Sequence, residues 1–214
     1  MESYDGRAPD VLRREKFLEF ERPVVCYATG LFCGVMKPTI MKFGGTSVED
    51  ADAFRKEAAI VKLQLDLRPV IVVSAVAGFT NALLASAAKA IEGDARAATK
   101  SLEDYFGRHS LIAKETLSDG PRQAFETAAA DARREIRQLH KIIAAHPVTS
   151  RPLQDEIVAY GEYLSSLLLA AVLREHGLAA RHVDARECIR TDDNYGNAAP
   201  LSETTPATQA KLSP

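Results

Sequence analysis

The sequence contains few cysteines, carries little net charge and has no repeats. Its three cysteines, Cys26, Cys33 and Cys188, form no close pair and no metal-binding spacing, which is typical of reduced thiols in a cytosolic protein. A net charge of −2 with mixed signs gives no indication of nucleic acid or an anionic membrane as a partner. There is no low-complexity tract either. These absences favour an ordinary cytoplasmic globular protein.

The length and composition fit one folded domain. The 214 residues are 46% hydrophobic and 26% charged. Residues 1–35 look unlike the rest, and their apolar run at 24–33 is shorter than the roughly 20 residues that a membrane span needs. We expect 1–35 to be a non-native or disordered extension and Met36 to begin the functional unit. The folded part should then cover 36–200, with 201–214 as a truncated tail.

Strands alternate with helices from Thr39 onward, which predicts an α/β fold with a mainly parallel sheet. Ser47 is expected to cap the first helix. The apolar strand at 70–73 should be buried on both faces, as parallel sheets require. The five histidines are interpreted as surface residues, and no metal site is assigned. The predicted strands are 39–41, 70–73 and 180–183, and the predicted helices begin after Ser47 and at 82–91, 97–117, 122–145 and 153–176.

The segment K-F-G-G-T-S-V at residues 42–48 joins the first strand to the first helix. Glycines allow a backbone to approach an anion and to adopt φ values that a side chain forbids, and the next helix start offers unpaired N–H groups. A lysine adds a mobile positive charge. The pattern therefore predicts a phosphate-binding turn, although it lacks the Walker spacing. Spacing alone also fits a simple tight turn with a solvent-facing lysine. The residues concerned are Lys42, Gly44, Gly45, Thr46 and Ser47.

Two further segments carry candidate substrate-binding residues. Ser74 and Thr80 flank a glycine turn after the second strand, where hydroxyls and backbone amides can orient a small zwitterion. Thr80 could equally be the cap of the next helix. Glu162 follows Gly161 in mid-helix, where a glycine costs about 1 kcal/mol and so indicates close approach by another group. Glu162 could bind a substrate ammonium, or it could be a solvated helical glutamate.

Together these segments resemble the signatures of aspartate kinases in the amino-acid kinase family. The run at 42–48 matches residue for residue, S-A-V-A-G-F-T at 74–80 resembles the family's S-A-x-x-G-x-T, and G-E at 161–162 follows in the same order. The resemblance implies a three-layer α/β/α sandwich, incomplete in this chain. It also implies ATP, with Mg²⁺, as the phosphoryl donor and the L-aspartate β-carboxylate as the acceptor, yielding 4-phospho-L-aspartate.

By the same resemblance, Lys42 is catalytic and contacts ATP phosphate together with the glycine turn, Ser74 and Thr80 lie in the aspartate pocket, and Glu162 binds the amino acid. Residues 184–193 resemble a mainly architectural family segment. Homodimers, a cytoplasmic location and a place in lysine, threonine and methionine synthesis are implied as well.

The resemblance covers only the first part of an aspartate kinase. The family's next strand, its glycine-rich loop, its adenine-binding part and its regulatory domains have no counterpart before Pro214. Because phosphoryl transfer needs charge stabilisation from several sides, we expect the fragment to be inactive alone. The alternatives are another amino-acid kinase, or a non-catalytic fragment or half-domain that works beside a complementing chain.

Overall fold

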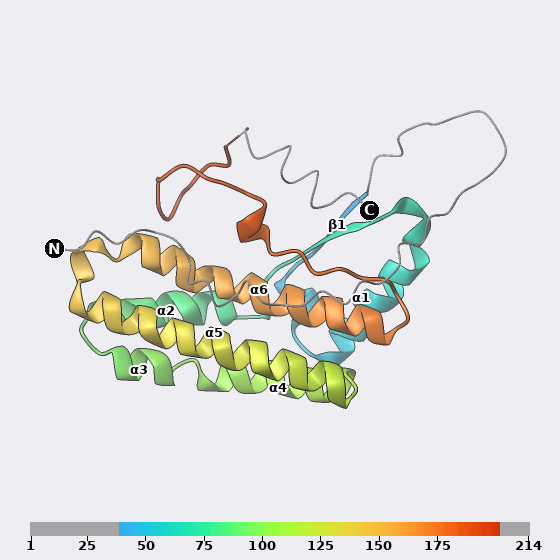
Figure 1. Ribbon diagram of the computed structural model, residues 1–214, viewed down its shortest axis with the longest axis horizontal. Coiled ribbons are helices and arrows are strands. Elements are labelled where there is room, and N and C mark those ends of the chain that lie inside the picture. The colour runs from blue at the N-terminus through green and yellow to red at the C-terminus, as the bar shows by residue number, and fades with distance from the viewer. Residues whose placement is uncertain (1–38, 202–214) are drawn as a thin grey trace. The chain divides into compact units, whose positions relative to one another are not determined.

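The computed structural model describes residues 39–201 (Figure 1). The expected extension at 1–35 and nearly all of the expected tail at 201–214 lie outside these residues. In order, the elements are β1 (Ile40–Phe43), η2 (Gly45–Val48), α1 (Ala51–Leu63), η3 (Leu65–Leu67), β2 (Val70–Val73), α2 (Phe79–Ile91), α3 (Ala95–Lys100), α4 (Glu103–Thr116), α5 (Asp119–Ala145), η4 (Pro147–Thr149), α6 (Arg151–Glu175) and η5 (Ala185–Glu187).

The two strands form a parallel pair, as predicted. Ile40 lies opposite Val70 and Phe43 lies opposite Val73, and the crossover between the strands runs through α1. Because the strands are parallel, their carboxyl ends meet at one edge of the sheet. The turns that follow β1 and β2 therefore begin side by side.

The first helix begins at a different cap from the one predicted. Asp50 is the N-cap of α1, and its Oδ1 accepts a hydrogen bond of 2.8 Å from the backbone N–H of Ala53. Ser47 instead lies in the short 3₁₀ turn η2. An aspartate is as good a cap as a serine, so capping preference alone could not distinguish these two nearby positions.

The sheet has one packed face and one exposed face. Phe43 and Val73 are buried in the core, whereas Ile40 is 71% exposed and Val72 is 45% exposed. The prediction that 70–73 is buried on both faces is therefore wrong. Within residues 39–201, the helices cover only one face of the sheet, so the second helical layer of a three-layer sandwich is not among them.

The third predicted strand, at 180–183, is not a strand in the structure. Among residues 39–201, the sheet contains only β1 and β2. The Ala180 carbonyl accepts a hydrogen bond of 3.1 Å from Arg174 Nη1, and His182 Nε2 lies 3.0 Å from Ser166 Oγ. Side chains of α6 thus hold this segment, and no strand among the described residues provides the ladder that would define a third one.

The helix bounds differ from the prediction by a few residues at several ends, and two differences change the reading of the chain. The expected helix at 97–117 is divided into α3 and α4 by a turn at Ser101 and Leu102. Helix α5 begins at Asp119 and includes Gly120 and Pro121 in its first turn, where the sequence predicted a break. Proline is tolerated there because the first turn of a helix has no partner for that N–H.

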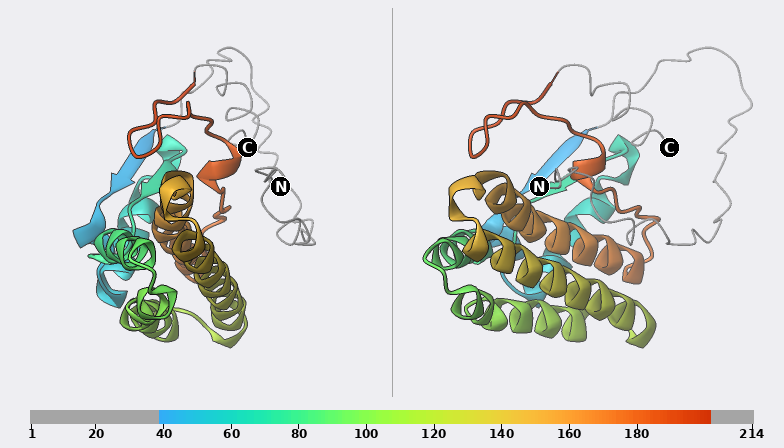
Figure 2. Two further views of the ribbon diagram at one scale, coloured as in Figure 1. Left: turned by 90° about the vertical axis from the view of Figure 1, so that its left-hand side faces the viewer. Right: turned by 60° about the vertical axis from the view of Figure 1, so that its left-hand side comes forward.

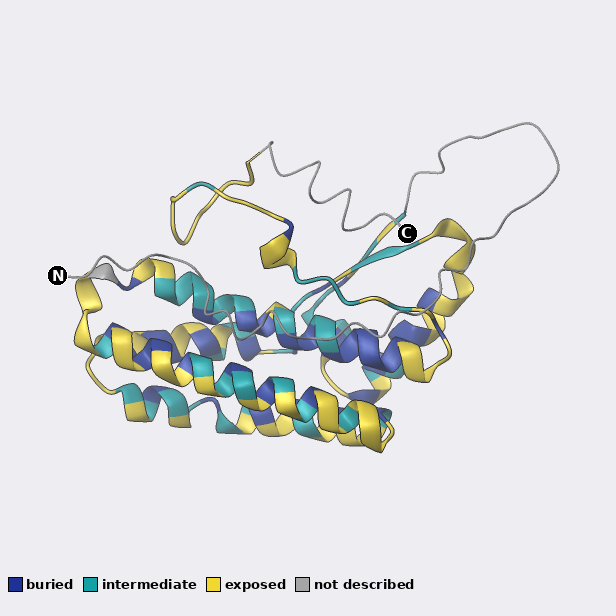
Figure 3. Ribbon diagram, in the orientation of Figure 1, coloured by how far each residue is buried: buried dark blue, intermediate teal, exposed yellow. Residues whose placement is uncertain are grey.

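Helix α6 is the centre of the core. It packs against α1, α2, α4, α5 and β2, and it lies between the strands and α5 (Figures 1 and 2). Figure 3 shows buried residues along α6 and on the facing sides of its neighbours. In the part of the chain that the structure describes, α6 alone is long and apolar enough to cross a membrane, but 61% of its apolar window is buried inside the fold.

Two histidines contradict the surface interpretation. His109 and His140 are fully buried. The Tyr105 carbonyl lies 2.7 Å from His109 Nδ1, while Ser86 Oγ and Thr99 Oγ1 lie 3.0 and 3.1 Å from the two nitrogens of His140. Burial lowers the pKa of each ring to about 4, so both are neutral side chains of the core at pH 7.

Candidate functional site

The turn after β1 is compact and lies against the second turn. Ser47 N donates to the Gly44 carbonyl at 3.0 Å, and a Cβ placed on Gly45 would stand 3.6 Å from the Ala75 carbonyl oxygen. Gly44 has an ordinary extended backbone, with φ of −84° and ψ of 175°, and Gly45 has no positive φ either. The expectation that these glycines adopt forbidden φ values is therefore wrong. The other expectation, that the backbone here is open to an anion, is consistent with the structure at Gly44, because a Cβ placed on Gly44 would have no other atom within 4 Å.

The turn after β2 does require a glycine. Ser74 N donates to the Phe43 carbonyl at 3.1 Å, which extends the strand pairing by one residue. Gly78 has φ of +80°, in the left-handed region, and serves as the N-cap of α2. Thr80 lies inside the first turn of α2 and does not cap it. The cap interpretation of Thr80 is therefore wrong, and its hydroxyl is available for another role.

Helix α6 is fitted closely to this second turn. A Cβ placed on Gly161 would stand 2.8 Å from the Ala75 Cβ and 4.0 Å from the Thr80 hydroxyl oxygen. Real Cβ atoms do not approach so closely, so Gly161 is required for the contact. The next residue, Glu162, uses Oε1 to accept a hydrogen bond of 3.3 Å from the Ala75 backbone N–H. The structure thus brings Gly45, Ala75, Thr80 and Glu162 into one neighbourhood.

Lys42 lies elsewhere on the sheet. It is the third residue of β1 and pairs with Val72. Successive side chains of a strand alternate between faces, so Lys42 shares the exposed face with Ile40, opposite the buried Phe43. The lysine therefore emerges near the same edge as the two turns but on the face that α6 does not cover.

An arginine clamp fastens the following segment to α6, and sequence reasoning did not identify it. The Arg186 guanidinium lies over the rings of Tyr160 and Tyr163, 5.0 and 4.8 Å from their centroids. It also bonds both carboxylate oxygens of Asp184, with Nη2 2.7 Å from Oδ2 and Nε 3.0 Å from Oδ1. Tyrosines spaced three residues apart on a helix are the only signal that the sequence offered.

The clamp perturbs the titration of its members. Burial alone would raise the pKa of Asp184, but hydrogen bonds and charge attraction from Arg186 outweigh it and hold that pKa below its usual value. Burial raises the pKa of Tyr160, and the Glu135 carboxylate that accepts its hydroxyl hydrogen bond raises it further. Asp184 is therefore ionised and Tyr160 protonated at neutral pH, which keeps the clamp closed.

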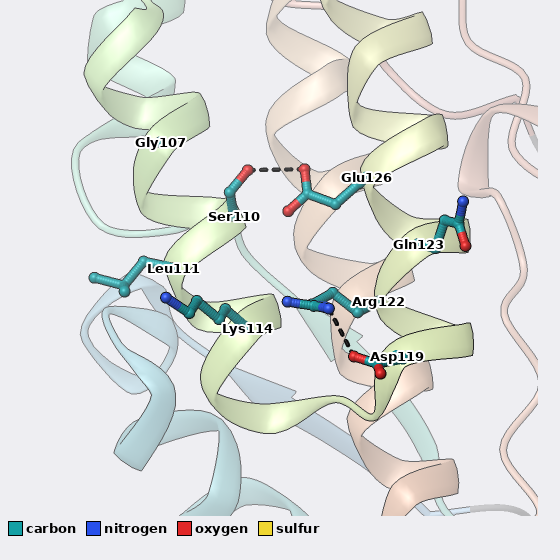
Figure 4. A pocket seen from close by; sticks show the side chains of 8 residues that line it. All are labelled: Gly107, Ser110, Leu111, Lys114, Asp119, Arg122, Gln123 and Glu126. Atoms are coloured by element: carbon teal, nitrogen blue, oxygen red, sulfur yellow. Dashed lines mark hydrogen bonds and ion pairs between the residues drawn. The ribbon is translucent and has the colours of Figure 1, made fainter.

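A separate pocket of about 700 Å³ lies between α4 and α5 (Figure 4). It contains none of the residues that the sequence singled out. Within residues 39–201, no group of three or more His, Cys, Asp or Glu side chains is arranged to hold a metal. The pocket is lined by polar and charged side chains that include Ser110, Lys114, Asp119, Arg122, Gln123 and Glu126.

This fold and these motifs define the class of the protein. Residues 37–212 match the amino acid kinase family, and the chain belongs to that family. Among curated relatives, it is 36% identical over 166 residues to lysine-sensitive aspartokinase 3 of Escherichia coli K12, covering 75% of this chain and 34% of the relative. It is 32% identical over 201 residues to chloroplastic aspartokinase 2 of Arabidopsis thaliana, covering 93% of this chain and 36% of the relative.

Solved structures agree with this assignment. The fold resembles E. coli aspartokinase III in complex with aspartate and ADP, with a TM-score of 0.70 and 32% identity over 82% of this chain and 37% of that one. The same enzyme in complex with lysine and aspartate gives a TM-score of 0.68 and 31% identity over 81% of this chain and 37% of that one. The chain spans about a third of the length of these relatives.

Proposed function

We propose that this chain carries the aspartate-binding part of an aspartate kinase. The observation that supports this most directly is the contact between α6 and the turn after β2. There, Glu162 Oε1 lies 3.3 Å from the Ala75 N–H, and Gly161 allows the two segments to touch. Glu162 and Ala75 are 87 positions apart in sequence, so the contact between them depends on the fold. The solved relatives of similar fold are complexes with aspartate.

Each group in this neighbourhood has a chemical role in the proposal. The Glu162 carboxylate pairs with the substrate ammonium, and the hydroxyls of Ser74 and Thr80 orient the amino acid. The β-carboxylate of aspartate then attacks the γ-phosphorus of ATP in line, giving 4-phospho-L-aspartate and ADP. No general base is needed, because a carboxylate of ordinary pKa is already ionised at neutral pH.

The turn after β1 fits the phosphate groups of ATP. Open space beside Gly44 allows a ligand to approach the backbone there, and the amides and hydroxyls of Gly45, Thr46 and Ser47 follow directly. Lys42, exposed near the same edge, is the catalytic residue that offsets charge on the transferring phosphoryl group. Within residues 39–201, no group of three or more His, Cys, Asp or Glu side chains is arranged to hold Mg²⁺, so in this proposal the ion enters with ATP as its co-substrate complex.

The complete reaction requires more than the described residues supply, because phosphoryl transfer needs groups on several sides of the phosphoryl group to stabilise its charge. We therefore propose that residues 36–200 bind aspartate and that phosphoryl transfer requires the part of the kinase domain that the relatives have in addition. A cytoplasmic location and a homodimeric assembly belong to the same proposal.

The exposed sheet face supports one alternative, a half-domain that works beside a complementing chain. Ile40 and Val72 present apolar surface where a parallel sheet is normally covered. Activity that appears only when the remaining two thirds of a related kinase is added as a separate chain would establish this alternative.

Calorimetric titration of the full 214-residue chain with L-aspartate tests the main proposal. We expect saturable binding that Glu162→Gln weakens at least about tenfold, since a hydrogen bond to a charged group contributes about 1.5–3 kcal/mol. Glu115→Gln, at an exposed position of α4, is the matched control and should bind like the parent chain. L-glutamate and D-aspartate serve as competing ligands. Preference for L-glutamate would favour another amino-acid kinase, and no binding of any amino acid would refute the proposal.

A further inference from the structure

Ser165 holds the same peptide group that Glu162 contacts. Its side chain is fully buried on α6, and its Oγ donates a hydrogen bond of 2.6 Å to the carbonyl of Ser74. The N–H of that peptide group belongs to Ala75 and donates to Glu162. One peptide group at the end of β2 is therefore held at its oxygen by Ser165 and at its nitrogen by Glu162.

The two bonds differ in what substrate binding would do to them. Glu162 is exposed to solvent, and its bond to Ala75 is long at 3.3 Å. A carboxylate that turns toward a ligand ammonium weakens or gives up that bond. Ser165 is fully buried, and its bond to Ser74 is short. The serine can therefore retain the peptide when the glutamate is engaged elsewhere.

We propose that Ser165 is a positioning residue for the aspartate site, an inference that rests on the proposed function above. It fixes the plane of the peptide between Ser74 and Ala75 against α6. That plane sets the direction of the Ser74 side chain and the start of the turn that leads to Thr80. Glu162 is thereby free to bind the substrate without letting the hydroxyls of the turn move away.

The position of Ser165 on the helix explains why it can do this. It lies about one helical turn beyond Gly161 and Glu162, which at 1.5 Å per residue is about 6 Å and about 4.5 Å further along the axis, respectively. Its hydroxyl also lies 3.3 Å from the Gly161 carbonyl, a longer and weaker alternative within the helix. The shorter bond to Ser74 identifies the turn as its main partner.

Ser165→Ala tests the role, with Ser86→Ala as the matched control. Ser86 is also fully buried in a helix, and its hydroxyl donates to the Leu83 carbonyl at 2.7 Å and lies 3.0 Å from His140 Nε2. Its loss therefore removes buried hydrogen bonds that do not include the peptide group between Ser74 and Ala75. We expect Ser165→Ala to weaken L-aspartate binding of the folded full-length chain about tenfold, and Ser86→Ala to change it less than about twofold. A purely structural serine would lower the melting temperature without changing the affinity of the folded molecule.

Amide exchange measured by NMR separates this inference from the function on which it rests. We expect the Ala75 amide to exchange faster in Ser165→Ala than in Ser86→Ala, whether or not aspartate binds. If the parent chain binds no aspartate, the proposed function and the substrate role of Ser165 both fail. If the parent binds aspartate and Ser165→Ala binds it equally well, only the positioning role is overturned.

A second variant is available if Ser165→Ala does not fold. Gly161→Ala places a Cβ against Ala75 and moves the same turn away from α6. Weakened aspartate binding in Gly161→Ala supports the positioning role. Unchanged affinity would show that aspartate binding does not depend on the spacing between the turn and α6, and would overturn the positioning role.

Discussion

Gly161→Ala is the sharpest test of the close fit between α6 and the turn after β2. The new Cβ would stand 2.8 Å from the Ala75 Cβ, which is attached directly to the backbone and cannot move aside. It would also stand 3.3 Å from Leu83 Cδ1, which lies at the end of a flexible side chain and can move. Overpacking a core usually costs about 1–3 kcal/mol. Replacing a mid-helix glycine by alanine returns about 1 kcal/mol. We therefore expect the free energy of unfolding to fall by up to about 2 kcal/mol.

Gly107→Ala isolates the packing contribution. Gly107 is an exposed position within α4, and no atom lies within 4 Å of a Cβ placed on it. This variant gains the helix propensity without the clash and should be stabilised by about 1 kcal/mol. The difference between the two variants in urea unfolding measures the overpacking cost, about 1–3 kcal/mol.

Removing the opposing methyl should relieve the clash. In the double variant Ala75→Gly/Gly161→Ala, the Cβ at 161 no longer meets the Cβ at 75. A double-mutant cycle should then show a favourable coupling of about 0.5–3 kcal/mol, as is usual for residues in contact. The reasoning is refuted if Gly161→Ala is as stable as Gly107→Ala, or if the cycle shows no coupling.

Three further predictions concern stability. Both carboxylate oxygens of Glu57 are buried without a hydrogen-bond partner, and burial raises its pKa from 4.5 to about 8. Its protonated form therefore favours folding below pH 4.5, and this contribution is lost as the pH rises toward 8, by at most about 1.4 kcal/mol per pH unit. Thermal unfolding at pH 5, 6.5 and 8 should show a flatter profile for Glu57→Gln, and parallel profiles would contradict this. Asp50→Ala should cost about 1 kcal/mol in urea unfolding through the lost cap of α1, whereas Glu49→Ala, at an exposed position that does not cap α1, should change stability little. Arg186→Lys should lower the melting temperature because an ammonium cannot bond both Asp184 oxygens and stack on two rings, and an unchanged value would show that the clamp contributes nothing.

Short-range features were largely predictable from the sequence. The run at 42–48, the turn at 74–80 and the pair at 161–162 indicated the family, and the amino acid kinase match at 37–212 confirms it. The α/β class, the parallel pairing and the long central helix also followed from local patterns. Such features depend on neighbouring residues, whose spacing is visible along the chain.

Contacts between distant segments were not predictable in the same way. Ser165 looked like any small residue beside an apolar stripe, yet it is bonded to the Ser74 carbonyl 91 positions away. His109 and His140 carry no local sign that they are buried. The segment at 180–183 is predicted as a strand from its place in the alternation of strands and helices, but a strand also needs a partner, and α6 holds that segment instead.

By itself, the sequence determined the family, the two paired strands, the long central helix and the side chains available to the site, because each of these depends on residues close together along the chain. The tertiary structure alone decided that Gly161 must be a glycine, that Glu162 meets Ala75, and that Lys42 emerges on the uncovered face of the sheet. Those outcomes depend on which surfaces pack together, and packing joins atoms that the linear order keeps far apart.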